Sequence, residues 1–251
     1  MIQTTNAVVL RSSIFRETSQ LLTFLTQDFG KIHTLAKGVR RLPFRFGSTF
    51  ELFTCNRIVF YERRRSDLQL LSQCDLVDSF PPIRQDLKKM AYAVYFTELV
   101  DRTTEPGDRS GRMYRLLLEG LKGLSKTEFL EEVARIFEVK LLSASGLMPE
   151  LARCQGCGGK VTPPSSLSLR KGGVLCGRCV GTHKEAGVFP VSKGSLIYLQ
   201  RMVSSPWESS ERIRISKSCT TELKEILKRF IDFHLEEKIH SRDFLEELET
   251  L

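Results

Sequence analysis

Cys154-Gln155-Gly156-Cys157 is followed, after eighteen intervening residues, by Cys176-Gly177-Arg178-Cys179. Each C-x-x-C turn lets two thiolates bind one ion, and two such turns make a closed tetrahedral site with no open position for water or substrate. The spacing therefore predicts a structural metal site made of Cys154, Cys157, Cys176 and Cys179. One zinc ion is the expected occupant, and iron is the alternative.

Disulfides are the competing interpretation of these cysteines. The other three, Cys55, Cys74 and Cys219, are scattered and odd in number, which disfavours a disulfide framework. The N-terminus has no signal-peptide pattern, and no apolar run approaches about eighteen residues. We therefore expect a cytoplasmic protein with reduced thiols. His183, close to Cys179, is an alternative ligand, although structural zinc rarely takes more than four.

Positive charge is concentrated in the first third of the chain. The formal net charge is +8. The window from residue 31 to residue 65 alone carries +7, and a second basic window spans residues 147–201. Such clustering favours a polyanionic partner, nucleic acid above all, with a solvated basic surface as the alternative. The candidate contacts are the nine basic residues of the first window, Lys31, Lys37, Arg40, Arg41, Arg45, Arg57, Arg63, Arg64 and Arg65.

Up to about residue 80 the chain has the pattern of short strands. Five segments are rich in β-branched or aromatic residues and are separated by turn signals: 7–11, 21–26, 31–36, 53–61 and 68–74. Asp28-Phe29-Gly30 is the expected hairpin turn between the second and the third. Five strands in this length, without a helical pattern among them, fit a small OB-type barrel better than a sandwich.

After Pro81-Pro82 the apolar spacing becomes helical. Helices are expected over residues 83–103, 112–121, 194–202 and 221–240. A further helix is expected to begin at a capping box, Ser125-Lys126-Thr127-Glu128, and to stop at Gly146. Strands at 166–170 and 173–175 would carry the cysteines. We expect an α+β multidomain fold: an OB-type barrel (1–80), a helical bundle (81–148 and 183–251) and an inserted four-cysteine zinc module (149–182).

The order of these parts, together with local motifs, resembles the RecO family of bacterial recombination mediators. In the barrel the similar motifs are Val9-Leu10-Arg11, Glu17-Thr18-Ser19, Thr26-Gln27-Asp28-Phe29-Gly30 and a basic loop, Ala36-Lys37-Gly38-Val39-Arg40-Arg41. Around the cysteines they are the segment from Phe137 to Leu151, the segment from Cys154 to Gly158 and Gly172-Gly173 ahead of Cys176. The resemblance spans nearly the whole chain.

The resemblance implies a non-enzymatic protein of DNA repair and homologous recombination. Such a protein binds single- and double-stranded DNA and anneals complementary strands. With RecR it helps load RecA on DNA coated by single-stranded-DNA-binding protein, and it is expected at the bacterial nucleoid. Phe44, Phe46 and Tyr61 could stack on bases, with burial in the barrel as the alternative for the two phenylalanines.

Two other functional classes stay open from the residues alone. One is a zinc-ribbon enzyme or transcription-type DNA-binding factor, in which the two C-x-x-C turns themselves would contact DNA. The other is a protein–protein adaptor whose basic face binds acidic tails. The sequence has no phosphate-binding loop and no nucleophile elbow, so we predict that the chain is not an enzyme.

Overall fold

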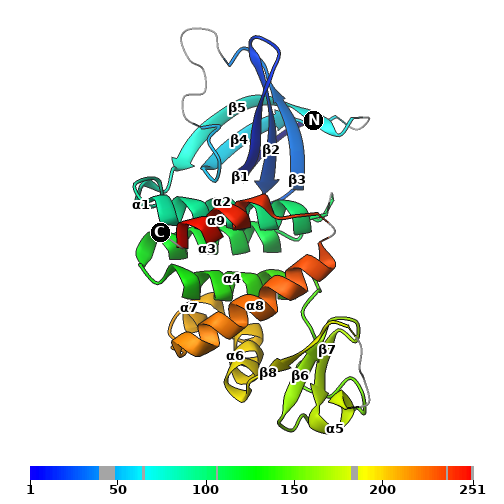
Figure 1. Cartoon of the computed structure of the whole chain (residues 1–251). Coiled ribbons are helices and arrows are strands. Elements are labelled where there is room, and N and C mark those ends of the chain that lie inside the picture. The colour runs from blue at the N-terminus through cyan, green and yellow to red at the C-terminus, as the bar shows by residue number, and fades with distance from the viewer. Residues whose placement is uncertain (40–48, 64–65, 106, 182–185, 236, 250–251) are drawn as a thin grey trace. The chain divides into compact units, whose positions relative to one another are not determined.

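The computed structural model describes residues 1–39, 49–63, 66–105, 107–181, 186–235 and 237–249. The chain divides into two compact units, Met1–Leu130 with Ile239–Leu251, and Glu131–Lys238. The first contains a β-barrel and helices, and the second contains helices and a small sheet (Figure 1). Over the described ranges, no helix combines the length and the apolar character needed to cross a membrane.

The barrel consists of β1 (Ile2–Phe15), β2 (Ser19–Thr26), β3 (Gly30–Ala36), β4 (Cys55–Tyr61) and β5 (Leu68–Asp78). It closes in the order β1-β2-β3-β5-β4. The β3–β5 pair is parallel, and the other pairs are antiparallel. The predicted five-stranded barrel of the OB type is therefore confirmed, together with the α+β fold class.

Alternation along the strands decides which side chains fill the barrel. Val9 and Phe24 are cross-strand partners, and both are fully buried in the core. A bulge between Val9 and Arg11 places two residues of β1 against one of β2. Because a bulge bends its strand, the fourteen-residue β1 can pair with β2 along one part and with β4 along another.

The β2–β3 turn holds the barrel close to the helices of the same unit. Thr26 Oγ1 accepts a hydrogen bond from the Phe29 N–H at 2.9 Å and donates one to the Gly30 carbonyl at 2.8 Å. Gly30 has φ +67°, and a Cβ there would lie 2.3 Å from the Asp108 carbonyl oxygen. Glycine is therefore required at the predicted turn for two independent reasons.

The helices of the first unit are α1 (Pro81–Arg84), α2 (Leu87–Thr103), α3 (Arg112–Lys126) and α9 (His240–Glu249). The prediction of one helix over 83–103 is wrong, because the chain breaks between α1 and α2. Asp86 has extended backbone angles, and its carboxylate accepts a hydrogen bond from the Lys89 N–H at 3.0 Å. It is thus an N-cap that starts a new helix.

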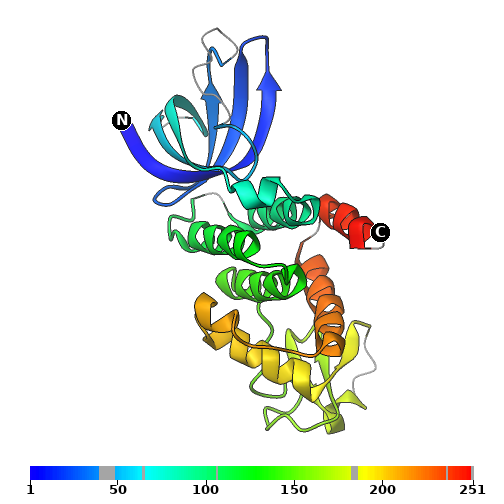
Figure 2. The ribbon, with the colours of Figure 1, turned by 90° about the vertical axis from the view of Figure 1, so that its left-hand side faces the viewer.

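Helix α9 lies beside α2 in both ribbon views (Figure 2). Glu98 of α2 accepts hydrogen bonds from the N–H groups of His240 and Ser241, at 3.2 and 2.8 Å, and from the Ser241 hydroxyl. Burial alone would raise the pKa of Glu98, but the hydrogen bonds from Ser241 and His240 lower it below its ordinary value. A carboxylate from α2 therefore caps the N-terminus of α9.

The second unit contains α4 (Leu130–Ala144), β6 (Ser165–Ser168), β7 (Gly173–Cys176), α5 (Gly177–Val180), β8 (Val188–Val191), α6 (Lys193–Ser204), α7 (Trp207–Ser210) and α8 (Lys217–His234). The capping box predicted at Ser125 is wrong. The Ser125 hydroxyl donates to the Leu121 carbonyl inside α3, and α4 starts only at Leu130. The stop at Gly146 is confirmed by its φ of +73°.

The sheet of the second unit has the order β7-β6-β8. The predicted strands at 166–170 and 173–175 correspond to β6 and β7, whereas β8 was not predicted. It contains Pro190, which argues against a central strand but is accepted in β8, because β8 is at the edge of the sheet in the described part of the chain and pairs with β6.

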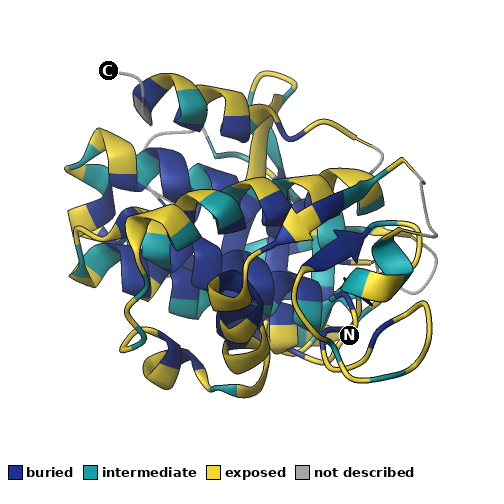
Figure 3. Cartoon of the chain, turned by 60° about the horizontal axis from the view of Figure 1, so that its bottom comes forward, coloured by how far each residue is buried: buried dark blue, intermediate teal, exposed yellow. Residues whose placement is uncertain are grey.

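Helix α8 buries one side and exposes the other, as Figure 3 shows for the helices generally. Its buried side includes the predicted residues Leu223, Ile226, Leu227, Phe230 and Ile231. The helix ends at His234 rather than at residue 240, because Leu235 has extended angles. Glu222 of α8 accepts hydrogen bonds from the Ser192 N–H and from the hydroxyls of Ser192 and Ser195, at 2.6–2.7 Å, and so holds the start of α6.

Candidate metal centre and nucleic-acid interface

The four cysteines of the two C-x-x-C pairs lie together in the second unit. Cys154 and Cys157 come from the loop before β6, whereas Cys176 ends β7 and Cys179 lies in α5. Their Sγ atoms all lie within 4.8 Å of one another, and those of Cys157 and Cys176 are 3.9 Å apart. A tetrahedral ion about 2.3 Å from each sulfur needs sulfurs about 3.8 Å apart, so the arrangement fits such an ion.

Backbone donors favour the thiolate form that a metal ligand needs. Cys154 Sγ accepts hydrogen bonds from the N–H groups of Cys176 and Gly156 at 3.2 and 3.4 Å. Burial alone would raise the pKa of Cys154, but these hydrogen bonds outweigh it and lower the pKa to about 6. The backbone N–H of Cys179 likewise lowers the pKa of Cys176.

Cys179 shows the opposite effect. Desolvation, together with the neighbouring sulfurs, raises its pKa to about 12. Four adjacent thiolates repel one another, so a bound cation is the natural means of keeping all four ionised. The cluster packs against Leu175, Val180 and Val188 on one side. A set of four cysteine ligands leaves no open position on the ion, which is typical of a structural rather than a catalytic site. The alternative ligand His183 lies outside the described residues.

The predicted DNA contacts are only partly visible in the described ranges. Five of the nine basic residues, Arg40, Arg41, Arg45, Arg64 and Arg65, lie outside them, as do Phe44 and Phe46. Lys37, Arg57 and Arg63 are described and have exposed side chains. Lys37 directly follows β3, Arg63 lies two residues beyond the end of β4, and Arg57 lies within β4 opposite Asp75 of β5. Their role in binding DNA stays a prediction.

Lys31 is placed differently from the other three. Its ammonium lies 2.6 Å from the main-chain oxygen of Asp101 and 3.4 Å from the carboxylate of the same residue. Its side chain is only 13% exposed, and that of Asp101 is 6% exposed. The Arg11 guanidinium pairs with the same carboxylate. Lys31 thus joins the barrel to α2 in the described structure.

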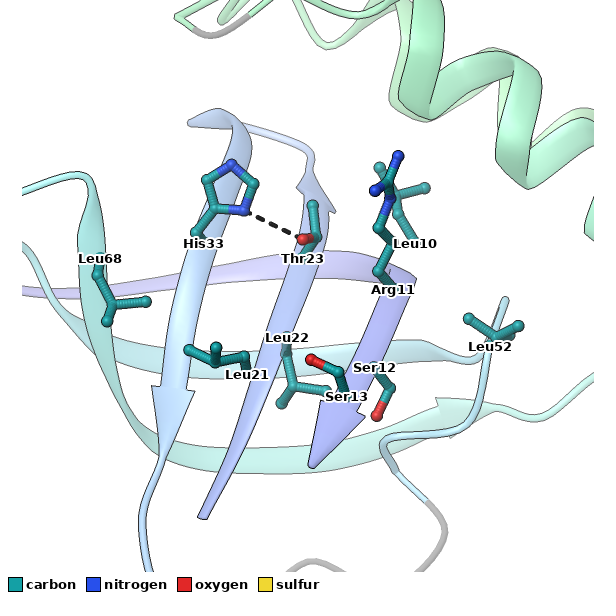
Figure 4. Close-up of a pocket in the computed structure, with 10 residues that line it drawn as sticks. All are labelled: Leu10, Arg11, Ser12, Ser13, Leu21, Leu22, Thr23, His33, Leu52 and Leu68. Carbon is teal, nitrogen blue, oxygen red and sulfur yellow. Dashed lines mark hydrogen bonds between the residues drawn. The ribbon is translucent and has the colours of Figure 1, made fainter. Parts of the chain in front are cut away.

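An open groove of about 710 Å³ lies on the face made by β1, β2 and β3 (Figure 4). Its apolar lining comes from Leu10, Leu21, Leu22, Leu52 and Leu68. Its polar lining includes Arg11, Thr23 and His33. This face carries the strands with which OB folds bind oligonucleotides.

Our sequence reasoning missed this groove because it selected residues by positive charge. The alternation along β2 could have indicated it. Leu22 and Phe24 belong to the barrel core, so Leu21 and Thr23, which alternate with them, lie on the opposite face of β2. Tyr61, the described aromatic candidate, is 42% exposed on β4 and does not line the groove.

Comparison with known proteins covers both parts of the chain. Residues 1–80 match the family described as Recombination protein O N terminal, and residues 84–243 match Recombination protein O C terminal. DNA repair protein RecO of Moorella thermoacetica is 33% identical over 243 residues, covering 96% of this chain and 89% of the relative. DNA repair protein RecO of Symbiobacterium thermophilum is 32% identical over 249 residues, covering 98% and 97%. Family matches over both parts, near-complete relatives and the closed barrel followed by helices agree: the chain belongs to the RecO family of DNA repair proteins.

Proposed function

We propose that this protein is a recombination mediator that binds single- and double-stranded DNA and anneals complementary strands. Membership of a family of DNA repair proteins carries the proposal. A closed five-stranded barrel of the OB type supports it, because such barrels bind oligonucleotides. The net charge of +8 supports a polyanionic ligand.

We propose that the cations of the first basic window contact phosphates. Lysine and arginine on phosphates release condensed counterions, which gives affinity for any sequence and a strong salt dependence. Annealing needs this tolerance, since a surface that neutralises two strands reduces their repulsion without holding the bases away from each other. Among the described residues, the exposed Lys37, Arg57 and Arg63 are the candidates, whereas Lys31 has a largely buried side chain that pairs with Asp101.

The proposal extends to partners and location. With RecR the protein would help RecA replace single-stranded-DNA-binding protein, acting in the bacterial cytoplasm at the nucleoid and without catalysing a reaction. We also propose that the chain is divided into three domains: the barrel (1–80), the helical bundle (81–148 and 183–251) and the cysteine module (149–182). The packing of α9 on α2 supports a helical part assembled from both sides of the module.

We propose that Cys154, Cys157, Cys176 and Cys179 hold one zinc ion. When bound, the ion would supply a cross-link between the loop before β6 and the β7–α5 junction. Cys154 already ties these segments together, because its sulfur accepts the Cys176 N–H. Elemental analysis of the purified protein would distinguish zinc from iron.

Strand annealing tests the functional proposal. Complementary fluorescent oligonucleotides should anneal faster with the protein than without it, and Lys37→Glu should reduce that acceleration. Lys88→Glu is the matched control, because Lys88 is an exposed lysine on α2 and the change in net charge is identical. Equal annealing by the two variants would remove Lys37 from the interface, and no acceleration by the unmodified protein would refute the proposed activity.

A further inference from the structure

The four cysteines of the proposed metal centre differ in how far solvent reaches them. Cys154 and Cys176 are each 1% exposed, and Cys179 is half-buried. Cys157 is exposed, so it offers more of its side chain than the other three to a reagent dissolved in water. Oxidation of a cysteine depends on its exposure and on its thiolate character, and the thiolate is the form that binds a metal.

The turn that carries Cys157 is closed by backbone hydrogen bonds and open on its outer side. The Cys154 N–H donates to the Gly159 carbonyl at 3.0 Å, and the Gly158 N–H donates to the Cys154 carbonyl at 2.8 Å. Gly158 has φ +69°, and a Cβ added there would meet no atom of the described residues within 4 Å. A small oxidant can therefore approach Cys157 from solvent.

A second sulfur lies close to Cys157. Its Sγ atom is 3.9 Å from the Sγ atom of Cys176, which belongs to the other C-x-x-C turn. A disulfide has its sulfurs about 2.05 Å apart, so these two must approach by about 1.9 Å. Moving the Cys154 sulfur instead would break the hydrogen bonds that it accepts from the N–H groups of Cys176 and Gly156. Cys176 is therefore the favoured partner of an oxidised Cys157.

We propose that Cys157 is a peroxide-sensitive modification site whose oxidation ends in a disulfide with Cys176. The inference rests on the proposed metal binding by the four cysteines and adds a reaction with an oxidant to it. The Cys157 thiolate attacks one oxygen of hydrogen peroxide, so that an S–O bond forms, the O–O bond breaks and hydroxide leaves. The product is a sulfenic acid at Cys157.

A second displacement completes the reaction. The Cys176 thiolate attacks the Cys157 sulfur, so that the S–S bond forms, the S–O bond breaks and a second hydroxide leaves. Each hydroxide takes a proton from solvent. The two sulfurs together lose two electrons, and both oxygens of one peroxide are reduced to water.

The disulfide replaces the cross-link that the ion supplies. Zinc is released because two of its four thiolate ligands are consumed. Cys157 lies in the loop before β6 and Cys176 ends β7, so the new bond joins the same segments as the ion. A disulfide within either C-x-x-C turn would leave the two turns unlinked. The cysteine module thus keeps a brace after an oxidant has displaced the metal.

Zinc release from the zinc-loaded, full-length protein tests the proposal. Hydrogen peroxide is added while a chromophoric chelator records free zinc, and a parallel sample contains dimedone, which traps sulfenic acids. One zinc should be released for each peroxide consumed, and dimedone should label Cys157 before any other cysteine. Peptide mapping by mass spectrometry should identify a disulfide between Cys157 and Cys176.

Two variants isolate the reactive sulfur. Cys157→His keeps four ligands, because three cysteines and one histidine also form structural zinc sites, and it should release zinc at least about tenfold more slowly. Cys219→Ser is the matched control, since Cys219 is a half-buried cysteine on α8 outside the cluster, and it should release zinc as fast as the unmodified protein. If Cys157→His takes up no zinc, dimedone labelling and disulfide mapping of the unmodified protein decide the question.

Limited digestion with trypsin tests the replacement of the cross-link. Arg170 and Lys171 are exposed and lie between the two C-x-x-C turns. Protein freed of zinc by a chelator under reducing conditions should be cut there rapidly. Peroxide-treated protein, equally free of zinc, should be cut more slowly because the disulfide holds the turns together.

The results separate this inference from the proposed metal centre. First labelling of another cysteine, or a disulfide within one turn, would overturn the assignment of Cys157 and Cys176. Retention of zinc in excess peroxide would overturn the reactivity, and equal cutting of the two zinc-free forms would overturn the replacement of the cross-link. Failure of the unmodified protein to bind zinc or iron would instead refute the proposed metal centre.

Discussion

Replacing Asp101 with alanine removes the anion that Lys31 and Arg11 share. Lys31 is the partner that decides the cost, because its side chain is 13% exposed and the Asp101 side chain is 6% exposed. Arg11 is 59% exposed, so water compensates most of its loss. The variant leaves Lys31 its hydrogen bond to the main-chain oxygen of residue 101, at 2.6 Å.

Breaking a buried ion pair from one side costs about 3–5 kcal/mol, and an exposed pair contributes about 0–1 kcal/mol. Because Lys31 keeps its main-chain hydrogen bond, we expect Asp101→Ala to lower the free energy of unfolding of the first unit by about 2–3 kcal/mol. Arg11→Ala should lower it by about 0–1 kcal/mol. The two variants remove partners from the same ion cluster, so their difference isolates the buried charge.

Amide hydrogen exchange read by mass spectrometry resolves this difference, since it reports opening of β1, β2 and β3 separately from the second unit. Protection in these strands should fall strongly in Asp101→Ala and little in Arg11→Ala. Asp101→Ala should also not weaken DNA binding, because it removes an anion that pairs with the exposed Arg11. Equal loss of protection in the two variants would refute the assignment of Lys31 as the buried partner.

Three further expectations concern separate parts of the chain. Hydrogen bonds lower the pKa values of Glu98 and Glu222, despite the opposing effect of burial, so they contribute stability that is present above the unfolded carboxylate pKa of about 4.5 and is lost as the pH falls through the lower folded values. Between pH 7 and pH 3 the free energy of unfolding, measured by denaturation, should therefore fall more in the unmodified protein than in Glu98→Gln, and an equal fall would contradict this. Gly30→Ala should lower the free energy of unfolding, measured with urea, by at least about 1 kcal/mol more than Gly146→Ala, because both positions have positive φ but only at Gly30 would the added Cβ lie 2.3 Å from a backbone oxygen. Equal losses in the two variants would contradict the close packing at Gly30. Cys176→Ser should release the metal and lower the melting temperature while the barrel still binds DNA, and unchanged stability with full loss of metal would exclude a bracing role.

Local sequence signals predicted the barrel and the metal cluster because each depends on short-range pattern. The strand alternation around Phe24 and the turn at Gly30 are encoded within a few residues, as is the C-x-x-C spacing. The break at Asp86 was missed because the apolar stripe continues across it, although aspartate is a favoured N-cap. Strand β8 was missed because Pro190 argues against a strand unless its edge position is known.

Contacts between distant residues could not be predicted in this way. In the sequence Lys31 is one of nine basic residues predicted to contact DNA. Only the fold shows that its ammonium group bonds to Asp101, seventy residues away in sequence. The groove needed residues from four strands and a loop, and only the closed barrel brings Leu21, Leu52 and Leu68 to one face. The clustering of charge in the sequence therefore predicted a polyanionic ligand, whereas the leucine-lined groove could be found only in the tertiary structure.

The salt dependence of DNA binding tests most directly the claim that exposed cations of the barrel bind phosphates of any sequence. The affinity of the unmodified protein for single strands of two different sequences should fall linearly on a log–log plot with the same slope, and Lys37→Gln should make that slope shallower by about one. Lys88→Gln should leave it unchanged. A slope near zero for the unmodified protein, or one that differs between the two sequences, would contradict binding through the phosphate backbone.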